Sequence, residues 1–122
     1  MRQYQLGEVE SRFAKIIWRN EPLTSSELVN ICQKELNWHK STTYTVLRKL
    51  CQRGIFQNVN SVVTSCISEK DFDRKAGEKL VDERFGGSLP AFIAAFTSGK
   101  KLKKSEIAEI KKIISDYEKK GK

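Results

Sequence analysis

Apolar side chains recur every three or four residues in three segments of the first half of the chain, which is the spacing of amphipathic helices. The first segment covers about residues 7–20 and ends ahead of Pro22, because the residue before a proline avoids the α region. The second begins at Thr24, which together with Glu27 forms the pattern of a capping box. Charged residues separate the apolar positions, so each segment is predicted to bury one face only.

The third segment is a predicted helix over residues 42–53, with Ser41 as its N-cap and Gly54 as the left-handed residue after its last turn. Two runs rich in β-branched residues follow at 55–59 and 62–67, and the two residues between them form a hairpin turn. Three helices and a hairpin, with a short link before the third helix, predict a winged helix-turn-helix.

The second half of the chain contains three further helical segments, over about residues 69–85, 89–97 and 104–118. The whole sequence therefore predicts a mainly α fold with a small β-hairpin. Residues 5–70 would form a winged helix-turn-helix DNA-binding head, and residues 71–122 a C-terminal helical dimerisation domain of three helices.

This C-terminal region has large apolar stripes, and a unit so short seldom buries enough surface to be stable alone. The stripes must pack either on the head, in a single α-rich core, or on another copy of the chain. Separate helices that extend from the head with aromatic and isoleucine faces favour a homodimer. The predicted interface residues are Leu80, Phe85, Leu89, Phe92, Ile93, Phe96, Ile107, Ile110 and Ile114.

The formal net charge of the chain is +8, which favours a polyanionic partner where the charge is organised on one surface. No acidic residue occurs between Glu35 and Glu69, whereas several basic residues do. This acid-free stretch includes the predicted third helix, and it is therefore the better candidate for contact with nucleic acid.

The open face of the third helix has side chains suited to double-stranded DNA. Small hydroxyl residues near its N-terminus allow a close approach to bases or phosphates, and the helix dipole favours phosphate there. Tyr44 offers a donor and an apolar edge, whereas Arg48 can bind guanine through two hydrogen bonds or bind a phosphate. The other basic residues are expected to bind the phosphate backbone without reading sequence. The predicted DNA-binding residues are Lys40, Ser41, Thr42, Tyr44, Thr45, Arg48, Lys49 and Arg53.

The residue inventory does not favour an enzyme. His39 is the single histidine, and Cys32, Cys51 and Cys66 are widely spaced without a C-x-x-C pair, so we expect no metal site, cofactor or small-molecule substrate. The cysteines are interpreted as small buried apolar residues in a reducing compartment, with a thiol sensor as the alternative. The longest apolar run, residues 91–96, is too short to span a bilayer, and the N-terminal residues lack the apolar core of a signal peptide. A soluble cytoplasmic protein is expected.

Several motifs resemble the penicillinase and methicillin-resistance repressors, the BlaI/MecI family of winged-helix regulators. Residues 43–54, TYTVLRKLCQRG, are similar to the recognition-helix signature of that family. The other matching pieces are LGEVE at 6–10, IIW at 16–18, Trp38, FGGSL at 85–89 and the tail from Leu102 to Tyr117. Together these pieces cover nearly the whole chain in the order and spacing of the family.

The resemblance implies a homodimeric repressor that binds a palindromic operator and controls antibiotic-resistance genes of the β-lactamase type. It also implies that repression is relieved through a membrane-bound β-lactam sensor with a metalloprotease domain, followed by cleavage of an Asn-Phe bond in the dimerisation domain. The matching bond here is Ala95-Phe96, where Ala95 replaces the asparagine. Either induction does not use this cleavage, or the protease has a different preference at that position.

The wing also departs from the family pattern, which has basic residues around a glycine at the hairpin tip. Residues 59–62 are short and uncharged, so we expect few contacts between the wing and phosphates. A second class of function also stays open: a winged-helix module that binds protein, or binds nucleic acid without sequence preference. The dependence of binding on salt and on DNA sequence would distinguish this module from a repressor.

Overall fold

The structure is a computed structural model that describes residues 4–121. These residues form two compact units, one that reaches Lys79 and one that begins at Leu80, so the division falls inside the helix α4 (Glu69–Phe85). The predicted fold class, mainly α with a small sheet and a winged helix-turn-helix head, is confirmed.

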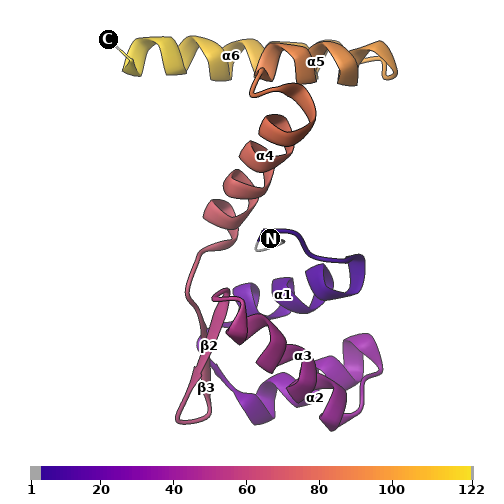
Figure 1. Cartoon of the computed structure of the whole chain (residues 1–122), viewed down its shortest axis with the longest axis vertical. Helices are drawn as coiled ribbons and strands as arrows, with labels where there is room; N and C mark the ends of the chain where they lie inside the picture. Colours follow the sequence, from indigo (N-terminus) through magenta and orange to yellow (C-terminus); the bar gives the residue numbers. More distant parts are fainter. Residues whose placement is uncertain (1–3, 122) are drawn as a thin grey trace. The chain divides into compact units, whose positions relative to one another are not determined.

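The first unit contains three helices and a small sheet, followed by the first turns of α4 (Figure 1). In chain order its elements are α1 (Glu8–Asn20), β1 (Leu23–Thr24), α2 (Ser25–Leu36), α3 (Lys40–Gln52), β2 (Phe56–Val59), β3 (Val62–Ser65) and the start of α4. The strand β1 was not predicted, because two residues are too few to show a β pattern in the sequence.

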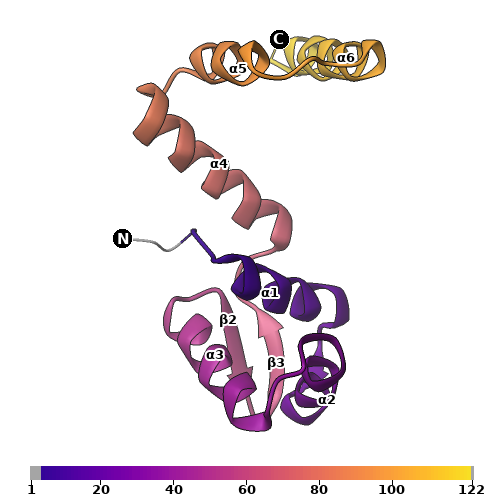
Figure 2. The same ribbon diagram turned by 90° about the vertical axis from the view of Figure 1, so that its right-hand side faces the viewer.

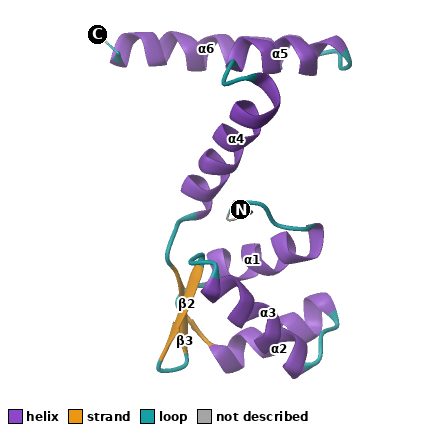
Figure 3. Ribbon diagram, viewed as in Figure 1, coloured by secondary structure: helices purple, strands orange, loops and turns teal. Residues whose placement is uncertain are grey.

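The sheet is antiparallel with strand order β1-β3-β2, and Figure 3 shows β2 and β3, the two strands of the wing, in orange. Strands β2 and β3 pair from Phe56 with Ser65 to Val59 with Val62. The two residues of the connecting turn have positive φ angles, 53° at Asn60 and 65° at Ser61, as a two-residue hairpin turn requires. The wing is therefore short and has no charged residue at its tip.

The core of the head lies between the three helices and the sheet. The rings of Phe13 and Trp38 stack with their centroids 5.4 Å apart, and Trp18 contacts Phe56 at 5.3 Å and Phe72 at 5.5 Å. Phe72 belongs to α4 and is buried in this core, so the head includes the first turns of α4. The boundary expected after residue 70 therefore lies earlier in the chain than the observed division.

The start of α2 is the predicted capping box. The backbone N–H of Glu27 donates to Oγ1 of Thr24 at 3.0 Å, and the N–H of Thr24 donates to the Glu27 carboxylate at 2.8 Å. The bond from the Thr24 backbone lowers the pKa of Glu27. Two of the orphan donors at this helix end are satisfied in this way.

The start of α3 differs from the prediction, which made Ser41 the N-cap. The N-cap is His39, whose carbonyl oxygen accepts from the N–H of Thr42 at 3.0 Å and from that of Thr43 at 3.2 Å. The preceding Trp38 is stacked on Phe13, and this packing places the first turn two residues earlier than the hydroxyl pattern indicated. Ser41 is consequently an exposed residue inside the first turn of α3.

The second unit contains the end of α4, then α5 (Leu89–Ser98) and α6 (Lys104–Lys120) (Figure 2). Gly86 and Gly87 end α4 with positive φ angles of 56° and 80°, a conformation that favours glycine. Ser88 then caps α5 by accepting a hydrogen bond from the N–H of Ala91 at 3.0 Å. These junctions lie where the sequence predicted them.

Neither α5 nor α6 buries any of its described residues within one chain. Of the residues predicted to form a dimer interface, Phe85 and Phe92 are half-buried against each other, with their ring centroids 5.4 Å apart. The other predicted interface residues are exposed: Leu80, Leu89, Ile93, Phe96, Ile107, Ile110 and Ile114. The bond between Ala95 and Phe96 lies inside α5, and both of its residues are exposed.

The three cysteines differ in environment. Cys32 is fully buried, and desolvation raises the pKa of its thiol to about 11. Cys51 is half-buried, and desolvation raises its pKa too, whereas Cys66 is exposed. The interpretation as buried apolar residues is correct for Cys32 and wrong for Cys66, which directly follows β3, the central strand of the sheet.

We expect iodoacetamide at neutral pH to alkylate Cys66 first, Cys51 more slowly, and Cys32 only after unfolding. The thiolate is the reactive species, and burial disfavours both its formation and its access to the reagent. Peptide mass mapping over time would give the order, with the denatured protein as the control in which all three react readily. Early labelling of Cys32 in the folded protein would contradict its burial.

Candidate nucleic-acid interface

The predicted DNA-binding residues lie on α3 or directly after it. Near its N-terminus Lys40, Ser41 and Thr45 are exposed, and Thr42 is half-buried. Farther along the helix, Arg48 is exposed one turn after Tyr44 on the open face. The opposite face is buried in the core through Thr43, Leu47 and Leu50. The helix thus presents hydroxyl groups and positive charge to solvent while its apolar face fixes it on the head.

Tyr44 is less available as a free donor than the sequence suggested. Its hydroxyl lies 3.3 Å from Oγ of Ser25, a buried residue in the first turn of α2, and donates a hydrogen bond to it. This bond joins the N-terminal half of α3 to the start of α2. The hydroxyl of Tyr44 is therefore engaged within the helix-turn-helix, and its ring remains half-exposed for contact with an apolar edge.

A hollow of roughly 260 Å³ lies between α3 and the strand β2, lined by Tyr44, Leu47, Arg48, Cys51 and Asn58. Figure 2 shows α3 lying along the sheet on the side of β2. Asn58 was not among the predicted site residues. Asn58 pairs with Val63, a core residue, and directly paired residues have their side chains on the same face of a hairpin. This pairing is the signal that could have indicated that Asn58 lies on the face next to α3.

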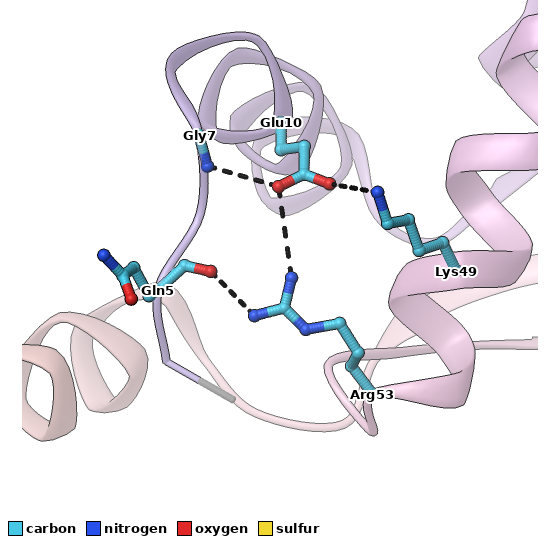
Figure 4. A network of polar contacts seen from close by, with 5 residues as sticks. All are labelled: Gln5, Gly7, Glu10, Lys49 and Arg53. Carbon is cyan, nitrogen blue, oxygen red and sulfur yellow. Dashed lines mark hydrogen bonds and ion pairs between the residues drawn. The ribbon is translucent and has the colours of Figure 1, made fainter. Parts of the chain in front are cut away.

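The C-terminal end of α3 meets the beginning of α1 in a polar network (Figure 4). The carboxylate of Glu10 lies 3.3 Å from Nζ of Lys49 and 4.0 Å from the Arg53 guanidinium. That guanidinium also donates to the carbonyl oxygen of Gln5 at 2.7 Å. Two residues predicted to bind phosphate are thus engaged with the protein itself, and sequence reasoning missed their acidic partner.

The position of Glu10 follows from the start of α1. Gly7 is the N-cap of this helix, and its backbone N–H donates to Oε1 of Glu10 at 3.2 Å. This hydrogen bond lowers the pKa of Glu10, and Lys49 and Arg53 lower it further, against the opposing effect of partial burial. Glu10 is therefore ionised at neutral pH and faces the end of α3 as a fixed negative charge.

Metal binding and membrane spanning have little support in the part of the chain that the structure describes. Among residues 4–121, no group of three or more His, Cys, Asp or Glu side chains is placed to hold a metal ion. No helix within the same residues is long and apolar enough to cross a membrane. What the head does present is an exposed helix with hydroxyl and basic side chains, which suits the phosphates and base edges of a DNA groove.

Comparison with known proteins agrees with this arrangement. The model of the penicillinase repressor family matches residues 6–116, a range that includes nearly all of the head and most of the second unit. The penicillinase repressor of Staphylococcus aureus is 24% identical over 123 residues, which cover 98% of this chain and 98% of that protein. The penicillinase repressor of Bacillus licheniformis is 22% identical over 122 residues, or 97% of this chain and 95% of that protein. The family resemblance that the sequence motifs indicated is confirmed, and this chain belongs to the penicillinase repressor family.

Proposed function

We propose that the protein is a homodimeric transcriptional repressor that inserts α3 of each head into the major groove of a palindromic operator. The observation that carries this proposal is the polar face of α3, on which Ser41, Thr45 and Arg48 are exposed. The names of the two relatives support repression as the outcome of binding, and they favour genes of the β-lactamase type as targets. A DNA partner of this kind places the protein in the cytoplasm.

The homodimer part of the proposal depends on the second unit. Its helices leave isoleucine, leucine and phenylalanine side chains exposed in one chain, for example Ile93 at 42% and Ile114 at 56%. Monomeric proteins rarely expose so many large apolar residues along neighbouring helices, because covering them with a second apolar surface is favourable. A second copy would cover them and would also present two heads to the two halves of a palindrome.

Release from DNA by proteolysis is a separate proposal. The bond between Ala95 and Phe96 is exposed, but it lies in the last turn of α5, and Nζ of Lys100, just beyond the helix, is 5.4 Å from the centroid of the Phe96 ring. A protease binds its substrate in an extended form, so cleavage here requires local unwinding of α5. Incubation with a membrane β-lactam sensor-protease and mass spectrometry of the products would test it, and an intact chain would contradict this route.

We expect Arg48→Ala to weaken binding to the operator by about 1–3 kcal/mol and to weaken binding to random DNA much less. The reason is that a guanidinium bound to a base edge contributes to one sequence only, whereas a phosphate contact contributes to all. Binding isotherms on an operator duplex, identified by footprinting upstream of the protein's own gene, and on a scrambled duplex at one salt concentration would measure both losses.

The matched control is Arg74→Ala, which removes the same charge from α4, where Arg74 forms exposed ion pairs with Asp71 and Glu78. We expect this variant to bind the operator almost as the wild-type protein does. Equal losses on operator and random DNA for Arg48→Ala would contradict base reading by α3. They would favour the alternative function, a module that binds nucleic acid without sequence preference.

A further inference from the structure

We propose that Glu10 competes with DNA phosphates for Lys49. In the free protein Glu10 pairs with Lys49, and when the head binds DNA this ion pair breaks and Lys49 contacts a phosphate. The proposal rests on the proposed DNA-binding function and names a residue that influences the affinity for DNA. Glu10 belongs to α1, outside the helix-turn-helix, and it would lower the affinity of the head for DNA of every sequence.

The geometry gives the carboxylate a fixed position independent of Lys49. Glu10 is the third residue of α1, and one of its oxygens accepts the backbone N–H of Gly7 at 3.2 Å. Its other oxygen lies 3.3 Å from Nζ of Lys49 (Figure 4). The side chain of Glu10 is 24% exposed, so the carboxylate is held at the surface where a phosphate oxygen could approach the same ammonium group.

The two basic residues of this network differ in how easily they can be exchanged. The Arg53 side chain is only 22% exposed, and its guanidinium also binds the Gln5 carbonyl oxygen at 2.7 Å. The Lys49 side chain is 63% exposed on the recognition helix and has a flexible stem. Arg53 therefore anchors the segment before α1, whereas Lys49 can turn from Glu10 to DNA.

The energetics permit this exchange. An exposed ion pair contributes little to stability, so a phosphate at the surface can displace the carboxylate from Lys49. Displacement nevertheless costs the Glu10 contact each time the head binds, whichever sequence it meets. The counterions released on binding come from the DNA, and the Lys49–Glu10 pair brings a net charge close to zero to the phosphates, so the pair releases fewer of them than an unpaired Lys49 would. A head with this pair depends less on phosphate contacts for its total affinity.

The test is Glu10→Gln in the full-length protein, because glutamine keeps an oxygen for the Gly7 N–H and removes only the charge. We expect this variant to bind a random duplex of about 20 base pairs two- to fivefold more tightly, the ratio that an exposed ion pair represents. Its slope of log K against log salt should steepen by up to about 0.9 between about 50 and 200 mM NaCl. Fluorescence anisotropy would measure both quantities.

Two variants make the result specific. Glu8→Gln changes the net charge equally, in the same exposed turn of α1 but outside the network, and should have a smaller effect. In a Lys49→Ala background, Glu10→Gln should no longer change the affinity. Equal effects of Glu8→Gln and Glu10→Gln, an effect that persists without Lys49, or weaker binding by Glu10→Gln would each overturn the competitor role.

These outcomes are distinct from failure of the proposed repressor. Binding of a random duplex does not require an operator. If the wild-type protein binds operator and random DNA equally well, that result contradicts repression and leaves the Glu10 measurement intact. Conversely, a clear operator preference combined with no difference between Glu8→Gln and Glu10→Gln would support repression and overturn the competitor. Thermal unfolding of each variant would show that the fold is retained in the comparison.

Discussion

The Ile114→Glu variant is expected to sediment as a monomer and to bind its operator on the order of 10²–10⁴-fold more weakly than the wild-type protein. Ile114 is 56% exposed on α6, and in the proposed dimer it is covered by the partner. A carboxylate buried there without a partner is strongly unfavourable. Once the two heads are separate, the second head no longer binds at the high effective concentration that the dimer provides, which accounts for the size of the loss.

Ser115→Glu is the matched control for this prediction. Ser115 is exposed on the same helix, next to Ile114, and the substitution adds the same negative charge. We expect it to remain a dimer and to bind the operator nearly as tightly as the wild-type protein. Sedimentation velocity over a range of protein concentrations would separate the two variants, and a dimeric Ile114→Glu protein would move the interface away from this face of α6.

The fold was predictable because its determinants are local. The capping box at Thr24, Pro22 after α1 and Gly54 after α3 each act within a few residues of their position. The hairpin turn at residues 60–61 is equally local, since the two turn residues and the flanking β-branched ones are adjacent in the chain. What local signals could not show was packing, so the extension of the head into α4 through Phe72 was missed.

The candidate interface was predictable in part. The periodicity of residues 40–52 separates the buried face from the open face, and Arg48 is exposed as expected. The stretch between Glu35 and Glu69 has no acidic residue in sequence, but in space it has acidic neighbours, because α1 places Glu10 beside Lys49 and Arg53. A contact between residues so far apart in the chain leaves no trace in the local pattern of charge.

The bond between Tyr44 and Ser25 has the same origin. From its place on the open face of the predicted recognition helix, Tyr44 was expected to contact DNA. The packing of α2 on α3, however, puts the buried hydroxyl of Ser25 within hydrogen-bonding distance of the Tyr44 hydroxyl. Side chains at the edge of a helix face are the ones whose role depends on the neighbouring element. Residues at its centre, such as Arg48 and Thr45, are exposed as the helical period predicts.

Phe13→Ala is expected to lower the free energy of unfolding of the head by about 3–5 kcal/mol. Phe13 is fully buried, and its ring stacks on Trp38 in the link that leads into α3. The substitution leaves a cavity and also removes the contact that fixes this link, because Trp38 directly precedes the N-cap of α3. Urea unfolding followed by circular dichroism would measure the loss.

The control for this prediction is Val9→Ala on the same helix, where Val9 is 49% exposed and lies outside the core. Its loss should stay within about 0.5 kcal/mol, as is usual for surface substitutions. Since the position of α3 depends on the Phe13–Trp38 stack, Phe13→Ala should also weaken operator binding under conditions in which the variant is still folded. Unchanged operator binding by folded Phe13→Ala would show that α3 is positioned by its other core contacts, Leu47 and Leu50, and does not require the stack.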